Sequence, residues 1–289
     1  MRRGDFSSAW ELSDRILRAR AGVPCWHLPR HEQWIWNGQP LQGKRVLVRC
    51  YHGLGDTVQY IRYLPKLSRI AREVYLWVQQ ELISLLECVP GVDHILPLHD
   101  GSPEIDYDID VEIMELAHVF RTTLDTIPKN IPYLRAEPAE LGPNTARLRV
   151  GIVWMAGGWD RRRSVPFELV RPLADLEGIE LHALQRGVPC PPEFGVDHST
   201  ADPHETARLL SALDLLISVD SFPAHLGGAL GRPVWTLLHA DCDWRWMRGR
   251  ESSSWYPTMR LFRQDSPGDW RKVIDRVAAE LRAEAATAR

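Results

Sequence analysis

The segment from Leu215 to Gly231 constrains the fold of this chain more than any other. It begins with an apolar run, Leu215–Val219, continues with Asp220 and Ser221, and ends in small residues. A continuous apolar run is typical of a central strand in a parallel sheet, where both faces are buried. A helix that starts directly after such a strand points unpaired N–H groups beyond the strand end. The segment therefore predicts a buried strand, an acidic turn and a helix whose N-terminus can hold an anion.

The rest of the chain alternates between short apolar strands and amphipathic helices, which predicts mostly parallel sheets. In the N-terminal half we expect strands at 46–48, 74–78, 93–96 and 105–109, with helices in 1–20, after Thr57 and at 81–88. In the C-terminal half we expect further strands at 148–154, 179–184 and 233–238, with helices at 167–176, from Asp202 and after Asp269. At the helix from Asp202, Asp202 can cap, Pro203 fits the first helical position and Glu205 can reach back as in a capping box.

The proline-rich, weakly periodic segment from Ile127 to Pro143 separates the two halves, and we place the domain boundary near residue 145. A chain of 289 residues with 44% hydrophobic content can form two compact domains. We expect a lead-in helix and Trp-rich segment at 1–40, a Rossmann-like domain at 41–145 and a second at 146–289. Such domains bind ligands at the carboxyl ends of their strands, which predicts two domains facing each other across a cleft.

Charge and composition narrow the class of partner. The net charge of -3 argues against a nucleic-acid or membrane-surface protein, since those carry a basic excess. No segment approaches the ~18 apolar residues of a membrane-spanning helix, and the N-terminus lacks the apolar core of a signal peptide. The five cysteines are scattered and form no CxxC pair, which suits a reducing compartment. We therefore expect a cytoplasmic protein with a small-molecule partner.

A second strand, turn and helix is expected where the strand at 46–48 leads through Gly53-Leu54-Gly55-Asp56 into a helix. The two glycines let the backbone approach a ligand, and the carboxylate of Asp56 at the helix start is a candidate general base. The alternative is an aspartate that only caps the helix after a tight turn. The third glycine of GxGxxG is missing, so a dinucleotide fingerprint is not supported.

The turn after Leu215–Val219 also has two interpretations. Asp220 and Ser221 are residue types that cap helices, and His225 falls within the first turns of the expected helix. The small residues that follow permit close contact with a phosphate or with a neighbouring strand. Ligand binding and simple capping with packing both remain open at this turn.

Three successive arginines, Arg161, Arg162 and Arg163, precede Ser164 in a glycine-containing loop after the strand at 148–154. A guanidinium pairs bidentately with phosphate oxygens, so this loop could clamp a diphosphate. For any one of the three, a solvated surface position is the alternative.

Other chemistries find little support. Cys25, His27 and His31, like His239 and Cys242, do not provide four ligands at zinc-finger spacing. A GxSxG nucleophile elbow is missing. The aromatic, basic loop from Asp243 to Pro257 favours packing, or stacking on a sugar or base, over nucleic-acid binding.

Several motifs together resemble glycosyltransferase family nine, in the same order, from about Trp34 to the end of the chain. They are His52–Tyr63, Arg161–Ser164, Ser218–Gly231, Asp243–Trp246 and Trp255–Pro257. The chain more closely resembles the glycosyltransferase domain at the C-terminus of bacterial tetratricopeptide-repeat proteins, relatives of the ADP-heptose:lipopolysaccharide heptosyltransferases. Tyr51-His52 stands where relatives more often have Glu-Gln, and Phe222-Pro223 replaces small or β-branched residues.

The resemblance implies the GT-B fold and inverting transfer without metal or cofactor. It also implies that the domain at 41–145 binds the acceptor and that the domain at 146–289 holds most of the nucleotide sugar. Asp56 would take the proton from the acceptor hydroxyl as that oxygen attacks the anomeric carbon. Asp220, Ser221 and His225 would form the turn that stabilises the departing diphosphate. The residues expected to bind the donor are Gly53, Gly55, Trp154, Arg161, Arg162, Arg163, Ser164, Gln185, Asp220, Ser221 and His225.

The donor is expected to be an ADP-, GDP- or UDP-linked sugar, and the sequence leaves the base, sugar, acceptor and oligomeric state open. Two other functions fit the same architecture: a nucleotide-sugar epimerase and a non-catalytic nucleotide-sugar-binding protein. Analogy of fold alone does not separate them.

Overall fold

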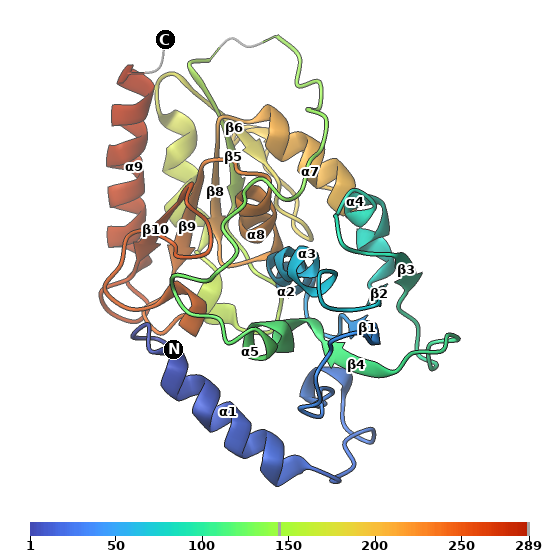
Figure 1. The fold of residues 1–289 in the computed structure, drawn as a ribbon. Helices are drawn as coiled ribbons and strands as arrows, with labels where there is room; N and C mark the ends of the chain where they lie inside the picture. The colour runs from blue at the N-terminus through green and yellow to red at the C-terminus, as the bar shows by residue number, and fades with distance from the viewer. Residues whose placement is uncertain (144–145, 288–289) are drawn as a thin grey trace. The chain divides into compact units, whose positions relative to one another are not determined.

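The computed structural model describes residues 1–143 and 146–287. The chain divides into two compact units, Met1–Leu134 and Arg135–Arg289, and each contains a parallel sheet with helices packed on it (Figure 1). The two units divide after Leu134, which lies inside the proline-rich segment but before the position near residue 145 at which the sequence places the boundary.

The first unit contains a four-stranded parallel sheet in the order β3-β2-β1-β4. Its strands are β1 (Arg45–Arg49), β2 (Glu73–Val78), β3 (His94–Pro97) and β4 (Ile109–Glu112). The helical segments between them are α2 (Leu54–Tyr60), η2 (Ile61–Tyr63), α3 (Leu64–Leu67), η3 (Gln80–Leu82), α4 (Ile83–Leu86), η4 (Ile113–Glu115) and α5 (Leu116–Val119). Four residues of the central strand β1 are buried, so β1 carries the core of this unit.

The N-terminal lead-in is part of the first unit. Helix α1 (Phe6–Arg20) begins after Asp5, whose carboxylate accepts a hydrogen bond from Ser8 N. Phe6 and Trp10 are the buried residues of this helix, and the Trp10 indole donates to the backbone oxygen of Thr122. A short turn, η1 (Arg30–Glu32), lies in the Trp-rich segment that follows. Helix α1 is therefore attached to the unit through contacts with residues that follow β4.

The strand predicted at 105–109 is displaced to Ile109–Glu112. Asp108 ends the preceding loop, because its carboxylate accepts hydrogen bonds from the backbone N and the guanidinium of Arg45. Pairing with β1 starts one residue later, where Ile109 lies opposite Val46. Residues 105–108 alternate apolar or aromatic with acidic side chains, and this pattern also occurs in a loop held by an ion pair, so it does not fix where the strand begins.

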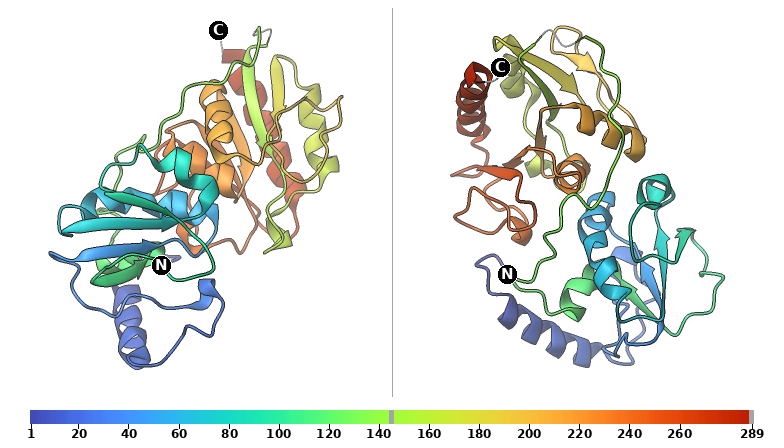
Figure 2. Two further views of the ribbon diagram at one scale, coloured as in Figure 1. Left: turned by 90° about the vertical axis from the view of Figure 1, so that its right-hand side faces the viewer. Right: turned by 45° about the horizontal axis from the view of Figure 1, so that its top comes forward.

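The second unit contains a six-stranded parallel sheet in the order β10-β9-β8-β5-β6-β7. Its strands are β5 (Leu148–Val153), β6 (Ile179–Ala183), β7 (Val196–Asp197), β8 (Leu215–Val219), β9 (Val234–Leu238) and β10 (Met259–Arg263). The helical segments are η5 (Arg161–Arg163), α6 (Phe167–Val170), η6 (Arg171–Asp175), α7 (Pro203–Ala212), α8 (Phe222–Ala229), η7 (Trp244–Trp246) and α9 (Trp270–Thr287). Figure 2 shows the long helix α9, in red, which contacts α6 and β10.

The strand and helix predicted from Leu215 are confirmed. All five residues of β8 are buried, and β8 lies between β9 and β5 in the sheet. Helix α8 starts at Phe222 and packs on β8 and β9. The short edge strand β7 and the outer strand β10 were not among the predicted strands.

The helix start at Asp202 is also confirmed, but the capping box is not. The Asp202 carboxylate accepts from His204 N, while Glu205 pairs instead with Arg208 one turn along α7. An i,i+3 ion pair on the helix surface competes with the return contact of Glu205 to the cap. Among the helices in the described parts of the chain, none combines the length and apolar character that a bilayer crossing demands.

Candidate functional site

The glycine turn at the start of α2 places Asp56 in the first turn of that helix. Gly53 is the N-cap, with φ -69 and ψ 160, which is an extended conformation that any residue type can adopt. The backbone N of Gly53 donates to Oδ2 of Asp56 at 3.1 Å, and Gly55 lies in the same turn. The capping contact expected as the alternative is thus present. It also fixes a half-buried carboxylate at a helix N-terminus, where the helix dipole favours the charged form.

Two residues that sequence reasoning did not select brace this turn. Gln79, just after β2, donates from Nε2 to the backbone oxygen of His52 at 2.7 Å and accepts from Thr57 Oγ1 at 3.1 Å. Oε1 of Glu112, at the end of β4, lies 2.9 Å from Nδ1 of His52. Both follow from the sheet order, since β2 and β4 flank β1 and their carboxyl ends lie beside the turn. The available signal was a polar residue at the end of each neighbouring strand.

In the second unit, the carboxyl ends of neighbouring strands bring together Trp154, Gln185 and Asp220. Strand β5 pairs with both β6 and β8, so residues just after these three strands lie at one edge of the sheet. Oε1 of Gln185 accepts from the backbone N of Trp154 at 3.1 Å and of Met155 at 2.8 Å. Gln185 therefore holds the start of the loop that leads to the arginines. Trp154 is buried against Phe167 and Phe194, so its ring is part of the core.

The three arginines expected to clamp a diphosphate have different surroundings. Arg162 is held by Asp160, with Nε at 2.9 Å from Oδ1 and an amino nitrogen at 2.8 Å from Oδ2. The Arg162 guanidinium lowers the pKa of Asp160 to about 2. Arg161 lies at an exposed position. Arg163 instead donates to the backbone oxygen of Asp220 at 3.1 Å, and its buried Nε finds no partner among the described residues. Arg163 is therefore the arginine directed at the start of α8.

The two serines expected in the site act on the backbone of their own turns. Ser164 Oγ accepts from Ala156 N at 3.1 Å, which closes the arginine loop. Ser221 is the N-cap of α8, but its hydroxyl donates to the backbone oxygen of Val219 at 3.1 Å. Pro223 occupies the first turn of α8 and has no N–H, so this helix end offers fewer backbone donors than an ordinary one.

His225 joins the buried Asp220 to the aromatic core of this unit. Its Nε2 lies 3.7 Å from Oδ1 of Asp220, and its Nδ1 lies 3.0 Å from the hydroxyl of Tyr256. Burial alone would raise the pKa of Asp220, but the hydrogen bond and charge of His225, with the charge of Arg245, hold that pKa below its ordinary value. Asp220 is therefore a stable anion at the end of β8. His225 is 3% exposed, so it orients Asp220 from inside the protein.

The aromatic, basic loop after β9 contributes mainly packing, which confirms the interpretation favoured from sequence. Trp246, Trp255 and Tyr256 are almost fully buried, and Trp246 stacks on His225 with ring centroids 5.3 Å apart. Tyr256 was not selected as a site residue, yet it positions His225. The Trp-Tyr-Pro motif was the signal that could have identified it.

The second unit thus presents, at one sheet edge, a guanidinium, a helix N-terminus and a buried carboxylate with its own counter-charges. Such a set can hold an anionic group through Arg163 and backbone N–H groups. Within residues 1–143 and 146–287, no three His, Cys, Asp or Glu side chains converge as metal ligands would.

The chain is similar to one curated protein in sequence and to several solved structures in fold. No protein-family model matches the chain. Protein FlbA of Caulobacter vibrioides is 28% identical to it, and the match covers 98% of this chain and 54% of FlbA. The chain therefore spans about half the length of the curated relative that it matches.

Several solved structures resemble the chain in fold, and three of them show the extent of the match. Escherichia coli ADP-heptose lipopolysaccharide heptosyltransferase II is 14% identical, with a TM-score of 0.58, and 84% of this chain covers 98% of it. The E. coli heptosyltransferase WaaC with ADP-2-deoxy-2-fluoro heptose is 14% identical, with a TM-score of 0.54, and 82% of this chain covers 99% of it. A family 9 glycosyl transferase of Veillonella parvula is 12% identical, with a TM-score of 0.54, and 78% of this chain covers 87% of it. The chain has the two-unit α/β fold of these family nine glycosyltransferases, the GT-B fold.

Proposed function

We propose that this chain is an inverting, metal-independent glycosyltransferase that moves a sugar from a nucleotide-diphosphate donor to an acceptor hydroxyl. The observation that carries the proposal is the position of Asp56 in a fold shared with heptosyltransferases. Its carboxylate is held at the N-terminus of α2 by Gly53 N, in a turn braced by Gln79. A carboxylate that is already held in place suits the role of general base, because it does not have to move before it accepts a proton.

In the proposed reaction, Asp56 accepts the proton of the acceptor hydroxyl while that oxygen forms a bond to the anomeric carbon of the donor sugar. The bond from the anomeric carbon to the diphosphate oxygen breaks on the opposite face, so the configuration at that carbon inverts. The diphosphate leaves with the bonding electron pair. Asp56 holds the proton at the end of the step and returns it to solvent.

The leaving diphosphate is assigned to the edge of the second sheet. Arg163 supplies positive charge there, and the N-terminus of α8 adds the helix dipole. Asp220 is compensated by His225 and Arg245, so its role is to hold the turn rather than to touch phosphate. These groups would replace the charge that a metal ion supplies in other transferases.

The donor is proposed to be an ADP-, GDP- or UDP-linked sugar. One E. coli neighbour carries ADP-heptose in its name and another was solved with an ADP-linked fluoro heptose, which puts ADP-linked donors first for testing. We also propose the cytoplasm as the compartment, because all five cysteines lie in the described residues and each thiol is free.

The substitution Asp56→Asn tests the proposal. The Asn side chain keeps an oxygen to accept from Gly53 N, so the turn survives while the base is lost. We expect sugar transfer to fall about 10²- to 10⁴-fold, the usual contribution of a general base, with donor affinity unchanged within about twofold. Product formation and titration calorimetry with the donor measure the two effects.

The exposed Asp125→Asn serves as the matched control and should keep full activity. Transfer at the wild-type rate in Asp56→Asn would contradict the assignment of Asp56. Turnover of donor alone into an isomerised sugar nucleotide would favour the epimerase, and donor binding with neither transfer nor hydrolysis would favour a binding protein.

A further inference from the structure

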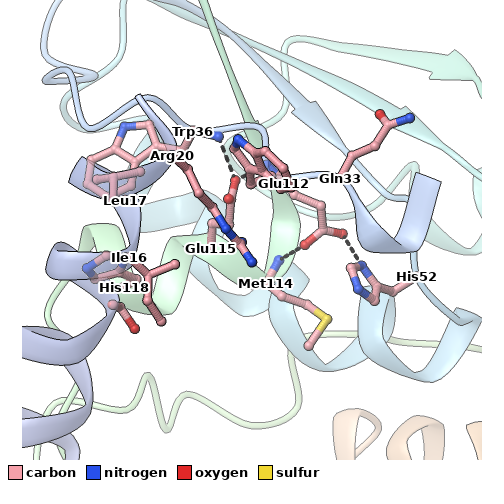
Figure 3. Close-up of a pocket in the computed structure, with 12 residues that line it drawn as sticks. Ile16, Leu17, Arg20, Gln33, Trp36, His52, Glu112, Met114, Glu115 and His118 are labelled. Carbon is pink, nitrogen blue, oxygen red and sulfur yellow. Dashed lines mark hydrogen bonds and ion pairs between the residues drawn. The ribbon is translucent and has the colours of Figure 1, made fainter. Parts of the chain in front are cut away.

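A pocket of about 340 Å³ lies within the first unit, between α1 and the segment that follows β4 (Figure 3). Arg20, Trp34, Trp36, His52, Glu112 and Met114 are among the residues that line it. Its volume falls in the range of about 300–1,000 Å³ that small-molecule sites occupy. We propose that this pocket binds one neutral sugar ring of the acceptor, an inference that rests on the glycosyltransferase function proposed above.

The wall on the N-terminal side is held rigidly to the sheet. Glu115, in η4, accepts through Oε2 from Trp36 N at 2.9 Å and from Glu112 N at 2.8 Å, and through Oε1 from Ile35 N at 3.3 Å. One carboxylate thereby joins the Trp-rich segment to the end of β4. The position of the neighbouring Trp34 is thus set before any ligand arrives, which lowers the cost of ordering it on binding.

The chemistry of the wall suits a sugar ring. Trp34 and Trp36 provide indole surface, and the guanidinium carbon of Arg20 lies 4.4 Å from the centroid of the Trp34 ring. The C–H groups on the flat face of a pyranose carry a slight positive charge, and the face of an aromatic ring is negative. Arg20 extends from α1 into the pocket and brings N–H donors for hydroxyl oxygens (Figure 3).

The opposite side of the pocket carries an oriented polar pair. Nδ1 of His52 lies 2.9 Å from Oε1 of Glu112, and Oε2 of Glu112 accepts from Met114 N at 2.7 Å. The His52 side chain is 29% exposed and that of Glu112 is 3% exposed, so the imidazole faces the pocket from a fixed anchor. An imidazole held in this way presents a ring of defined orientation to a hydroxyl group.

The charges of the pocket offset one another, which favours a neutral ligand. The lining contains the positive charge of Arg20 and the negative charge of the Glu112 carboxylate, and Glu112 also pairs with His52. Burial raises the pKa of Glu115 to about 7, so this second carboxyl is partly protonated near neutral pH. A hydroxylated ring matches such a lining better than a strong cation or anion does.

One residue that lines the pocket, His52, is close in sequence to Asp56, the proposed general base. His52 lines the pocket and directly precedes Gly53, whose backbone N binds Asp56. The anion-binding groups, by contrast, gather in the second unit around Arg163 and Asp220. A ring held in the first unit next to the base is therefore assigned to the acceptor and not to the donor.

Binding of methyl glycosides to the 289-residue chain tests the proposal. The probes are the methyl glycosides of glucose, galactose, mannose, rhamnose and N-acetylglucosamine, with methyl glucuronide as the charged arm, followed by ligand-observed NMR titration. We expect at least one neutral glycoside to bind, and Trp34→Ala to weaken its binding about tenfold or more, because the half-buried Trp34 forms the wall. Trp34→Phe keeps a flat apolar ring and should recover most of the affinity.

The matched control is Trp26→Ala, which removes a 62% exposed indole of the same Trp-rich segment outside the lining of the pocket. It should leave glycoside binding unchanged, and circular dichroism should show that all three variants fold. The proposal is overturned if no methyl glycoside binds, if Trp34→Ala binds as tightly as the wild type, or if methyl glucuronide binds more tightly than every neutral probe.

Transfer to the bound glycoside separates this inference from the proposed function. We expect Trp34→Ala to raise the KM for the glycoside acceptor while the KM for the donor stays constant. We expect Asp56→Asn to lower transfer about 10²- to 10⁴-fold while glycoside binding persists. If the wild type binds glycosides in a Trp34-dependent way but never consumes a donor, the proposed function fails and the acceptor role of the pocket fails with it. If donor is consumed with other acceptors and no glycoside binds, only the pocket proposal fails.

Discussion

Hydrogen bonding and burial act in opposite directions on the pKa of Glu115. Its carboxylate receives three backbone N–H groups, which favour the ionised form, yet burial and the nearby Glu112 raise its pKa to about 7. Burial is the larger effect, so the folded protein holds the Glu115 proton at a pH where an ordinary glutamate is ionised.

We therefore expect the free energy of unfolding to fall as the pH rises from about 4.5 to about 7, the ordinary and the raised pKa of Glu115. Over this interval the folded chain binds more protons at Glu115 than the unfolded chain does, and stability then decreases with pH. Glu115→Gln mimics the protonated acid and should flatten this part of the profile, measured as Tm against pH. Glu87→Gln, at an exposed position, is the control, and an unchanged slope in Glu115→Gln would contradict the assignment.

Arg163 and Arg162 are neighbours with the same side chain and different partners. Arg163 reaches the backbone of Asp220, whereas Arg162 is occupied by Asp160 and its side chain is 66% exposed. The tertiary contacts thus single out one of three arginines that the sequence treats alike.

We expect Arg163→Ala to weaken binding of a nucleoside diphosphate about tenfold to a hundredfold, since a charge-assisted hydrogen bond contributes about 1.5–3 kcal/mol. Arg162→Ala, the matched variant, should change the affinity less than about threefold. Titration calorimetry with ADP, GDP and UDP measures both. Equal losses in the two variants would show that the loop acts through its summed charge.

Helix α8 owes its position to close approach between its backbone and its neighbours. A Cβ added at Gly228 would lie 2.4 Å from Cδ1 of Tyr256, and one added at Gly227 would lie 2.8 Å from a methyl carbon of Val234. The glycines that the sequence offered for a phosphate contact are therefore used for packing between α8, β9 and the loop that carries Tyr256.

Gly228→Ala should lower the free energy of unfolding by about 1–3 kcal/mol, the usual cost of overpacking a core. The shift of Tyr256 should also disturb its contact with His225 and weaken nucleotide binding. Gly157→Ala is the control, because a Cβ at Gly157 meets open space among the described residues. Urea denaturation measures stability, and equal midpoints for the two variants would refute the packing role of Gly228.

Continuous burial made some of the strands easy to predict from the sequence. Strands β1, β5 and β8 were predictable because their residues are buried in continuous or nearly continuous runs. The two-residue edge strand β7 is exposed and leaves no such run. At α7, Glu205 had two competing partners, and local sequence does not decide between a return to the cap and an ion pair with Arg208.

Binding of the donor should raise the Tm of the chain. A ligand that binds only the folded state raises the Tm by mass action, by an amount that grows with its concentration over its Kd. We expect ADP-, GDP- or UDP-linked sugars to raise the Tm, and excess EDTA to change neither the Tm shift nor the transfer rate. Loss of transfer in EDTA, with recovery on adding a divalent metal, would contradict metal independence.

Long-range contacts decide how the N-terminal segment takes part. Trp10 bonds Thr122 across 112 positions of sequence, and His118 pairs with Asp14 across 104. The sequence showed α1 and the tryptophans after it as a lead-in, but their role as a wall of a pocket with Glu112 and Glu115 emerged only when β4 was placed beside β1.

Local pattern was sufficient for most of the strands and helices, for the two strand-turn-helix junctions and for the choice of Asp56 and Asp220 as candidates. Apolar periodicity and turn chemistry act over a few residues, and one sequence displays them directly. The partners of Glu115, Arg163 and His225 required the tertiary structure, because parallel pairing brings together strand ends that lie far apart in the chain. Whether a polar side chain serves a ligand, a cap or a neighbour depends on which group is placed beside it, and only the folded chain sets that.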